Sequence, residues 1–237
     1  PDKKVIFLAV GFETTAPLAA AAVLMAEKAG IHNFYVLSAH KLVPPALRIL
    51  LGAENRHIDG LLLPGHVSAM IGLTPYEFLI DEFNTPAVVA GFEPLDILQS
   101  IYMLVKQIHG NIGRLENQYS RIVTAAGNET ACQTLYKVYK TADTVWRGIG
   151  YLPGSGLAVR KEYSAFDARV AIPVDAEVTK EHAGCLCGQV LQGILLPTSC
   201  PLFGGKCTPE HPIGSCMVSV EGTCAAWYKY GSGRWQG

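Results

Sequence analysis

The sequence predicts an α/β fold built on a doubly wound, mostly parallel sheet, and three features of its N-terminal half support this prediction. Short apolar runs alternate four times with helix-forming runs, as in a doubly wound α/β unit. The apolar runs do not alternate with polar residues, which indicates parallel strands covered by helices on both faces. Loops of small residues separate the two kinds of run.

The expected strands and helices follow one another in order along the chain. We expect strands at Val5–Val10, Phe34–Leu37, Gly60–Leu63 and Ala87–Ala90. We expect helices at Ala16–Ala29, Ala46–Leu51, Leu95–Ile108 and Asn128–Lys140. The first helix has the clearest signals, because Thr15 can cap its start, Pro17 suits its first turn and Gly30 can end it.

Composition along the chain predicts three parts. Residues 1–110 form an α/β lobe, residues 111–172 a helical and connector region, and residues 173–237 a small irregular Cys-rich region. The connector is expected at Gly148–Gly156, which is rich in Gly and Pro. From about Pro173 onward helix signals are few, so we expect this last part to be held together by a metal or by cross-links.

The composition also excludes several kinds of function. A net charge of −1 over 237 residues does not give the basic surface that nucleic-acid binding requires. The apolar runs are too short for a membrane span. Motifs for dinucleotide binding, P-loop nucleotide binding and α/β-hydrolase chemistry are absent from the sequence. The chain begins at Pro1 without a signal-peptide pattern, so we expect a cytoplasmic protein and a sequence that is part of a longer chain.

Reactive side chains follow three of the four expected strands. They are Glu13, Thr14 and Thr15 after the first strand, His66 and Ser68 after the third, and Glu93 after the fourth. Because ligands bind beyond the carboxyl ends of parallel strands, we expect these groups to face one cleft. Carboxylates, an imidazole and hydroxyls can carry out acid–base chemistry or hold a metal. In the alternative interpretation the threonines cap a helix, the histidine packs and the glutamates are solvated.

Six of the seven cysteines lie between residues 185 and 224. In a chain without a secretion signal, this clustering indicates a metal site rather than disulfides. Paired C-x-x-C segments, the usual zinc signature, are absent from the sequence. Irregular spacing, with prolines close behind Cys200 and Cys207, favours an iron–sulfur cluster held by four thiolates from loops. The two further thiols could form a redox-active pair, whereas Cys132 is expected to be an ordinary buried thiol.

Several segments resemble one protein family. They are Gly-Phe-Glu-Thr-Thr (11–15), Pro-Gly-His-Val-Ser (64–68), Gly-Phe-Glu-Pro (91–94), Glu-Asn-Gln-Tyr-Ser-Arg (116–121), Trp-Arg-Gly (146–148), Cys-Leu-Cys-Gly (185–188), Met-Val-Ser (217–219) and Glu-Gly-Thr-Cys (221–224). Together they resemble the signature loops of the HypD family of [NiFe]-hydrogenase maturation proteins. The resemblance runs from the first residue to about Tyr230.

The resemblance implies an assembly or transfer factor with a redox role rather than a classical enzyme. Family members act with a small partner, HypC, and hold the iron that receives cyanide and carbon monoxide before its delivery to the hydrogenase large subunit. The cyanide comes from a second partner, HypE. The family fold has two α/β lobes around a cleft, with a [4Fe–4S] cluster in its C-terminal region. The cluster and nearby thiols are expected to supply electrons.

The cysteines divide into cluster ligands and a neighbouring pair. The expected ligands are Cys185, Cys200, Cys207 and Cys224, and the expected pair is Cys187 and Cys216. Side chains in C-x-C point apart on an extended chain, so only one of the first two cysteines should ligate. The family's spacing favours Cys185, and Cys187 stays an alternative. Cys216 precedes a strand-like stretch, whereas Cys224 follows a turn that can bend toward a metal.

The sequence departs from the family pattern at its start. The family's Cys-Gly-x-His and Cys-Pro-x-Cys segments, which supply its iron-handling thiols, would precede Pro1. We therefore expect the chain to be truncated, and residues 111–172 to complete a second lobe whose first part is missing.

Two other functions compete with the maturation factor. One is an iron–sulfur thiol/disulfide reductase that uses Cys187 and Cys216 beside the cluster. The other is a structural zinc protein that binds a partner without redox chemistry. Visible absorption from iron–sulfur charge transfer would separate the zinc protein from the others. Infrared bands of bound cyanide and carbon monoxide would separate the maturation factor from the reductase.

Overall fold

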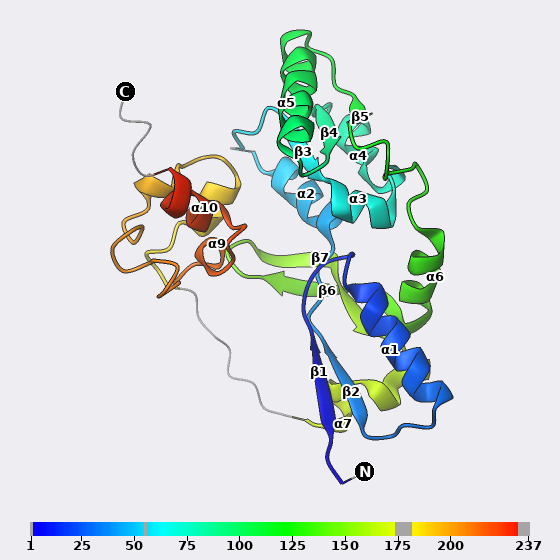
Figure 1. The fold of residues 1–237 in the computed structure, drawn as a ribbon. Helices are drawn as coiled ribbons and strands as arrows, with labels where there is room; N and C mark the ends of the chain where they lie inside the picture. Colours follow the sequence, from blue (N-terminus) through cyan, green and yellow to red (C-terminus); the bar gives the residue numbers. More distant parts are fainter. Residues whose placement is uncertain (1, 55, 174–181, 232–237) are drawn as a thin grey trace. The chain divides into compact units, whose positions relative to one another are not determined.

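The computed structural model describes residues 2–54, 56–173 and 182–231 (Figure 1). The chain divides into two compact units. The first unit comprises residues 1–48, 59–144 and 153–175, and the second comprises residues 49–58, 145–152 and 176–237. No helix of the described residues is long and apolar enough to cross a membrane.

The first unit contains a small parallel sheet made of β1 (Val5–Ala9) and β2 (Phe34–Ser38). The connecting helix α1 (Ala16–Lys28) buries a row of small residues, which lets it lie close to its neighbours. A long segment later in the chain, α6 (Glu129–Val138), packs beside α1. Thr15 stands at the N-cap of α1, but its hydroxyl donates to the Phe12 carbonyl, so the predicted side-chain cap is wrong.

A second parallel sheet of the same unit has the order β3 (Leu61–Pro64), β4 (Ala87–Ala90) and β5 (Leu115–Asn117). Between its strands lie helical elements in chain order. They are α3 (Gly65–Ile71), the 3-10 helix η1 (Thr74–Tyr76), α4 (Phe78–Asp81) and α5 (Pro94–His109). All four residues of β4 are buried, as expected of a central strand covered on both faces.

The predicted α/β class with parallel strands is confirmed. The strands are divided between two sheets rather than joined in one, and β5 was not predicted. The helix expected at Ala46–Leu51 is α2 (Val43–Gly52), and the helix expected at Leu95–Ile108 is α5.

The predicted connector is largely a strand. β6 (Tyr139–Trp146) and β7 (Gly150–Val159) pair in a two-stranded sheet, so most of Gly148–Gly156 belongs to β7. The short elements η2 (Lys161–Phe166) and α7 (Ala168–Ala171) follow. Leu157 and Val159 of β7 join the core formed by β1, β2, α1 and α6, so this strand is anchored by burial.

The Cys-rich unit consists of short helices joined by loops. They are α8 (Cys187–Leu191), the 3-10 helix η3 (Pro197–Ser199), α9 (Ser215–Val218) and α10 (Thr223–Tyr230). The strand-like stretch expected after Cys216 is wrong, because this residue lies in α9. Four cysteines take part in the buried core of this unit beside Val190, Leu202 and Met217.

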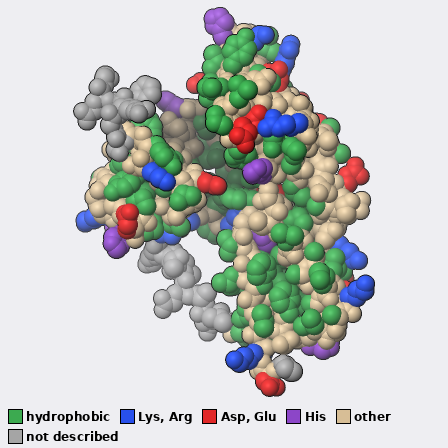
Figure 2. Space-filling model, in the orientation of Figure 1, with side chains coloured by type: hydrophobic (Ala, Val, Ile, Leu, Met, Phe, Trp, Pro, Cys, Tyr) green, Lys and Arg blue, Asp and Glu red, His purple; other side chains and the backbone are tan. Residues whose placement is uncertain are grey.

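The outer face of α5 is unusually apolar. Leu95, Leu98, Tyr102 and Val105 are more than half exposed and recur at helical spacing. Figure 2 shows hydrophobic side chains over this helix. The buried positions of α5 are instead polar, with Asp96 and two uncharged side chains.

Candidate functional site

Six cysteine side chains line one cavity in the second unit. They are Cys185, Cys187, Cys200, Cys207, Cys216 and Cys224. All of them are free thiols. The rest of the lining is mainly apolar, including Val190, Leu202 and Met217. Four of the six are buried and two are partly buried. Such thiols around an apolar cavity are a suitable donor set for an iron–sulfur group, which is held by thiolates and shielded from water.

The local structure explains how these cysteines come together. Cys185 lies in a loop, Leu186 has φ −103° and ψ 23°, and α8 starts at Cys187. The extended conformation expected for this segment is therefore wrong, and both of its cysteines line the same cavity. Cys200 directly follows η3, and Cys224 lies in the first turn of α10. Loops and short helices thus place cysteines around one cavity from several directions.

Contacts between sulfur and its neighbours are close on one side of the cavity. The sulfur atoms of Cys216 and Cys224 are 2.9 Å apart. The backbone N–H of Cys216 donates to the sulfur of Cys187 at 3.4 Å, and the N–H of Ile213 donates to that of Cys207 at 3.3 Å. Backbone donors of this kind favour a negatively charged sulfur, as a metal-bound thiolate is.

Three of these thiols favour their protonated form. Burial raises the pKa of Cys185 and of Cys224. Hydrogen bonding with Cys187, then burial, raises the pKa of Cys216. Among the described residues, no three His, Cys, Asp or Glu side chains are gathered closely enough to hold a single metal ion. The sulfurs surround a cavity, and a bound cationic cluster would convert its ligands to thiolates.

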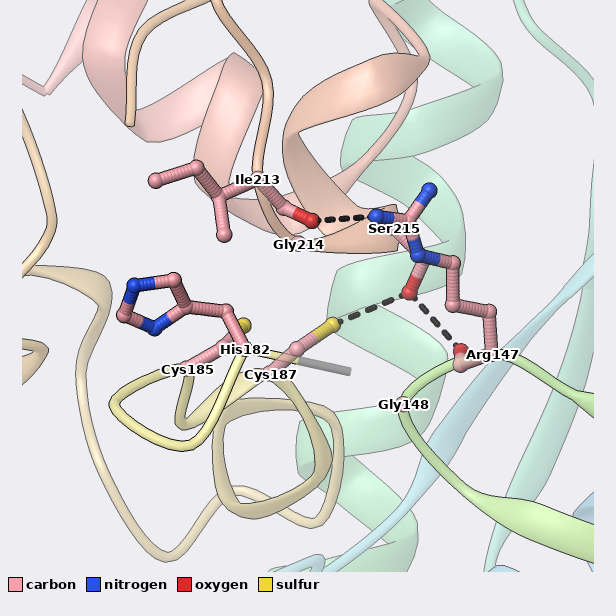
Figure 3. Close-up of a pocket in the computed structure, with 8 residues that line it drawn as sticks. All are labelled: Arg147, Gly148, His182, Cys185, Cys187, Ile213, Gly214 and Ser215. Carbon is pink, nitrogen blue, oxygen red and sulfur yellow. Dashed lines mark hydrogen bonds between the residues drawn. The ribbon is translucent and has the colours of Figure 1, made fainter. Parts of the chain in front are cut away.

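A second pocket lies against Cys185 and Cys187, and most of its other residues were not predicted (Figure 3). The hydroxyl of Ser215 lies 3.1 Å from the sulfur of Cys187 and donates to the carbonyl of Arg147 at 2.8 Å. His182 also lines this pocket. In the sequence, Ser215 directly precedes a cysteine and Arg147 lies in the Trp-Arg-Gly segment. Neither position by itself predicted a role for the side chain.

The first unit holds the predicted strand-end residues. Glu13 is only 1% exposed, and its Oε1 accepts a hydrogen bond from the Val43 N–H at 2.8 Å. Its Oε2 has no hydrogen-bond partner among the described residues. Burial raises the pKa of this carboxyl to about 7, although its backbone hydrogen bonds oppose the rise. Glu13 is therefore a buried carboxyl that can gain or lose a proton near neutral pH.

Tyr76 links Glu13 to a second predicted residue. Burial raises the pKa of Tyr76, while the nearby Ser68 hydroxyl opposes this and the Glu13 charge adds to it. Tyr76 and Ser68 are fully buried, and Ser68 donates to the Pro64 carbonyl at 3.0 Å. Sequence reasoning missed Tyr76, which lies in η1 away from any strand end.

The other predicted residues are exposed. The His66 ring stacks on Phe92 with 4.2 Å between ring centroids, so the loops after β3 and β4 lie side by side. Glu93, next to Phe92, is exposed, as are Thr14 and Thr15. The structure thus brings Glu13 close to Ser68 through Tyr76, and His66 close to the Glu93 loop. Whether all of these residues serve one site stays a prediction.

His40 is a buried group that the same strand-end rule could have found, because it follows β2. It is 2% exposed, and its Nδ1 has no hydrogen-bond partner among the described residues. Its ring lies edge-on to that of Tyr139 with centroids 6.0 Å apart. Burial lowers the pKa of His40, which keeps the imidazole neutral.

Two of the family-like segments are tied together behind the β4 loop. Arg121 donates to both carboxylate oxygens of Asp96, at 2.8 and 2.5 Å. Gln118 also donates to Asp96 and accepts from the N–H of Gly91. A Cβ at Gly91 would lie 2.1 Å from the Asp96 carboxylate, so a larger residue there would displace Asp96. The Gly-Phe-Glu-Pro loop is therefore positioned by the Glu-Asn-Gln-Tyr-Ser-Arg segment.

Comparisons with known proteins agree with this combination of loops and cysteines. A family model described as "HypD: Hydrogenase formation hypA family" matches residues 1–231. The chain is 44% identical to the hydrogenase maturation factor HypD of Rhizobium leguminosarum over 98% of its own length and 62% of that protein. It is 43% identical to HypD of Cupriavidus necator and 42% identical to HypD of Rhodobacter capsulatus, over 98% and 99% of its own length and 63% of each relative.

The extent of these matches decides the family. The chain spans about 63% of the length of the curated relatives that it matches. Within that span the family model includes the strand-end loops of the first unit and all six cysteines of the second. A match of this length and identity establishes that the chain belongs to the HypD family of hydrogenase maturation factors.

Proposed function

We propose that this chain takes part in the assembly of the Fe(CN)2CO group of [NiFe]-hydrogenases, as a scaffold and electron donor. The observation that carries the proposal is the set of six free thiols around one cavity. Relatives that match 98–99% of the chain are named hydrogenase maturation factors. The role is that of an assembly factor with redox chemistry rather than of a classical enzyme.

The resident cofactor that fits the cavity is a [4Fe–4S] cluster. Its proposed ligands are Cys185, Cys200, Cys207 and Cys224, with Cys187 as the alternative to the first. The thiols are buried or partly buried, unpaired in disulfides and arranged around the cavity from separate parts of the chain, as a cubic cluster requires. When bound, the cluster would store and pass on single electrons.

Cys187 and Cys216 form the proposed redox pair next to the cluster. Oxidation of the two thiols forms one S–S bond and releases two electrons and two protons. The two residues are already in contact, because the N–H of Cys216 donates to the sulfur of Cys187. A pair next to a cluster can exchange electrons with it over a short distance.

The strand-end loops are the proposed contact with the substrate iron and its cyanide and carbon monoxide ligands. Exposed His66 and Glu93 can meet a bound substrate, whereas buried Glu13 can hold or release a proton near neutral pH. The proposed partners are a HypC-like chaperone and a HypE-like cyanide donor, and the hydrogenase large subunit indirectly. We propose that the chain acts in the cytoplasm. Its proposed parts are residues 1–110, 111–172 and 173–237.

A thiol/disulfide reductase is the second candidate, because three thiols lie in contact. Cys216 is close to both Cys187 and Cys224. Such a grouping would suit electron transfer to a disulfide of another protein. In this function the cluster and the cysteine pair would act without any cyanide or carbon monoxide ligand.

The test uses protein purified without oxygen. We expect visible iron–sulfur absorption, with iron and acid-labile sulfide in equal amounts. Zinc without sulfide would instead identify a structural zinc protein. Co-purification with a HypC-type partner from a hydrogenase-producing host should then give infrared bands of cyanide and carbon monoxide. Cluster without those bands, together with disulfide reduction, would favour the reductase.

A further inference from the structure

Three groups beside the cysteine cavity form a chain of hydrogen bonds with a defined direction (Figure 3). The carbonyl of Arg147 can only accept, so the Ser215 hydroxyl uses its single proton on it, at 2.8 Å. The sulfur of Cys187 lies 3.1 Å from the same hydroxyl oxygen. Because that oxygen has no second proton to donate, the thiol of Cys187 must donate to it.

The turn between β6 and β7 is fitted closely around this chain. Gly148 has φ +89°, and a Cβ there would lie 3.0 Å from both the Cys187 sulfur and the Ser215 hydroxyl. A Cβ at Gly188 would lie 2.4 Å from the Gly148 carbonyl. The guanidinium of Arg147 donates to the Ile213 carbonyl at 2.6 Å. The turn therefore lies directly against the sulfur of Cys187 and the hydroxyl of Ser215.

The same sulfur is also held by the next residue along the chain. The N–H of Cys216 donates to the Cys187 sulfur at 3.4 Å. Ser215 and Cys216 are adjacent residues at the start of α9. The hydrogen bond between Cys187 and Ser215 therefore also keeps Cys187 close to Cys216. The sulfur of Cys187 is thereby placed between the hydroxyl of one residue and the backbone of the other.

We propose that Ser215 is a positioning residue that holds the Cys187 thiol against Cys216 and stabilises the reduced form of this pair. The inference rests on the proposed redox function of the two cysteines. With glutathione disulfide as oxidant, the two cysteines form one S–S bond. Two electrons and two protons pass to the oxidant, which becomes two thiols. Cys187 then has no proton to donate, so its bond to Ser215 exists only in the dithiol.

The experiment measures the dithiol–disulfide equilibrium of the full chain. Wild-type and variant proteins are equilibrated without oxygen in glutathione buffers of graded ratio, and the Cys187–Cys216 disulfide is quantified by alkylation and mass spectrometry. Ser215→Ala should shift the equilibrium about fivefold toward the disulfide, or about 20 mV. Ser215→Thr, which keeps the hydroxyl, should stay close to wild type. Ser219→Ala removes an exposed hydroxyl near the same helix and should change nothing.

Two outcomes would count against the inference in different ways. An unchanged equilibrium in Ser215→Ala, with the disulfide forming normally, would refute the role of Ser215 alone. A wild-type chain that never forms this disulfide would refute the redox pair itself, and the inference with it. Cys132, in the first unit, serves as a reference thiol whose rapid alkylation would reveal an unfolded variant.

A spectroscopic measurement on the wild type covers the case in which Ser215→Ala does not fold. The S–H stretching band of Cys187 is assigned by Raman difference against Cys187→Ala. A band at the frequency of a hydrogen-bonded donor supports the chain of hydrogen bonds. A band at the frequency of a free thiol overturns it.

Discussion

The carboxyl of Glu13 accepts a hydrogen bond from the backbone N–H of Val43, thirty positions later in the sequence. The loop after β1 is thereby joined to the first turn of α2, whose N–H groups lack partners within the helix. The second carboxyl oxygen has no hydrogen-bond partner among the described residues, which is costly for an ionised group. Glu13 therefore connects the loop after β1 to α2 through a carboxyl group that is costly to ionise.

The first prediction concerns the pH dependence of stability at this carboxyl. The pKa of Glu13 is raised from 4.5 to about 7, so the folded chain binds a proton more tightly than the unfolded chain. This contribution is fully present below pH 4.5 and is lost as the pH rises to about 7. A rise of this size corresponds to about 3 kcal/mol. Glu13→Gln keeps an acceptor for the Val43 N–H but should not show the loss.

Denaturant unfolding of both proteins from pH 4 to pH 8 measures the difference. The free energy of unfolding of the wild type should fall, relative to Glu13→Gln, by about 3 kcal/mol over this range. Glu27→Gln, at an exposed carboxyl of α1, should follow the wild type. Parallel curves for wild type and Glu13→Gln would show that Glu13 titrates as an ordinary carboxyl.

The sequence predicted those parts of the fold that depend on local pattern. Apolar runs and small-residue loops predicted β1, β2, β3, β4 and α1, because buried strands and helix ends have signals in residues that are close in the sequence. The pairing of the strands could not be predicted, because it depends on residues far apart in the sequence. The strands belong to two sheets. β5 contains Glu116 and Asn117, so it lacks the apolar signal of its partners.

Candidate site residues could be predicted from the sequence where they follow strands or where one residue type, cysteine, is clustered. Glu13, His66 and Glu93 were found from their positions after strands, and the six sulfurs from their clustering. Tyr76 and Ser215 were missed because their relevant neighbours lie far away in the sequence, Glu13 for Tyr76 and both Arg147 and Cys187 for Ser215. Most of β7 was predicted to be a connector because its glycines are typical of a loop, although buried side chains of this strand anchor it.

The second prediction concerns the ion pair behind the β4 loop. Asp96 has a side chain only 7% exposed, and hydrogen bonds from Arg121 and Gln118 hold its pKa well below the usual value of 3.8. This stabilisation is fully present above pH 3.8 and is lost as the pH falls further. Arg121→Ala should therefore lower the melting temperature at pH 7, and the difference from wild type should shrink below pH 3.8.

Two further variants sharpen this test of Asp96. Arg121→Lys keeps the charge but cannot contact both carboxylate oxygens, so it should lie between wild type and Arg121→Ala. Arg114→Ala removes an exposed cation nearby in the sequence and should leave the melting temperature unchanged. Equal melting temperatures for Arg121→Ala and wild type at pH 7 would contradict the structural role of the pair.

The third prediction concerns the exposed face of α5. Leu98 is 65% exposed and Val105 is 57% exposed on the same side of the helix. Because contiguous exposed apolar surface promotes association, the chain should self-associate as its concentration rises. Leu98→Lys combined with Val105→Lys should reduce this association several-fold in light scattering. Val170→Lys, at an exposed apolar residue of α7, is the matched control, and an equal reduction by it would refute a specific role for α5.

The last prediction assigns the cluster ligands. Serine replaces each of Cys185, Cys200, Cys207 and Cys224 in turn, and each variant should lose most of its iron and acid-labile sulfide, because a cubic cluster needs four thiolates.

Matched replacements separate ligation from folding. Cys187→Ser and Cys216→Ser should keep the cluster, since their proposed role is in the neighbouring pair. Cys132→Ser, in α6 of the first unit, removes a half-buried thiol that donates to the Met70 carbonyl and should have no effect on iron content. Cluster loss in Cys187→Ser with retention in Cys185→Ser would make Cys187 the ligand. Loss in Cys216→Ser with retention in Cys224→Ser would overturn the assignment, a sharp test because these two sulfurs lie only 2.9 Å apart.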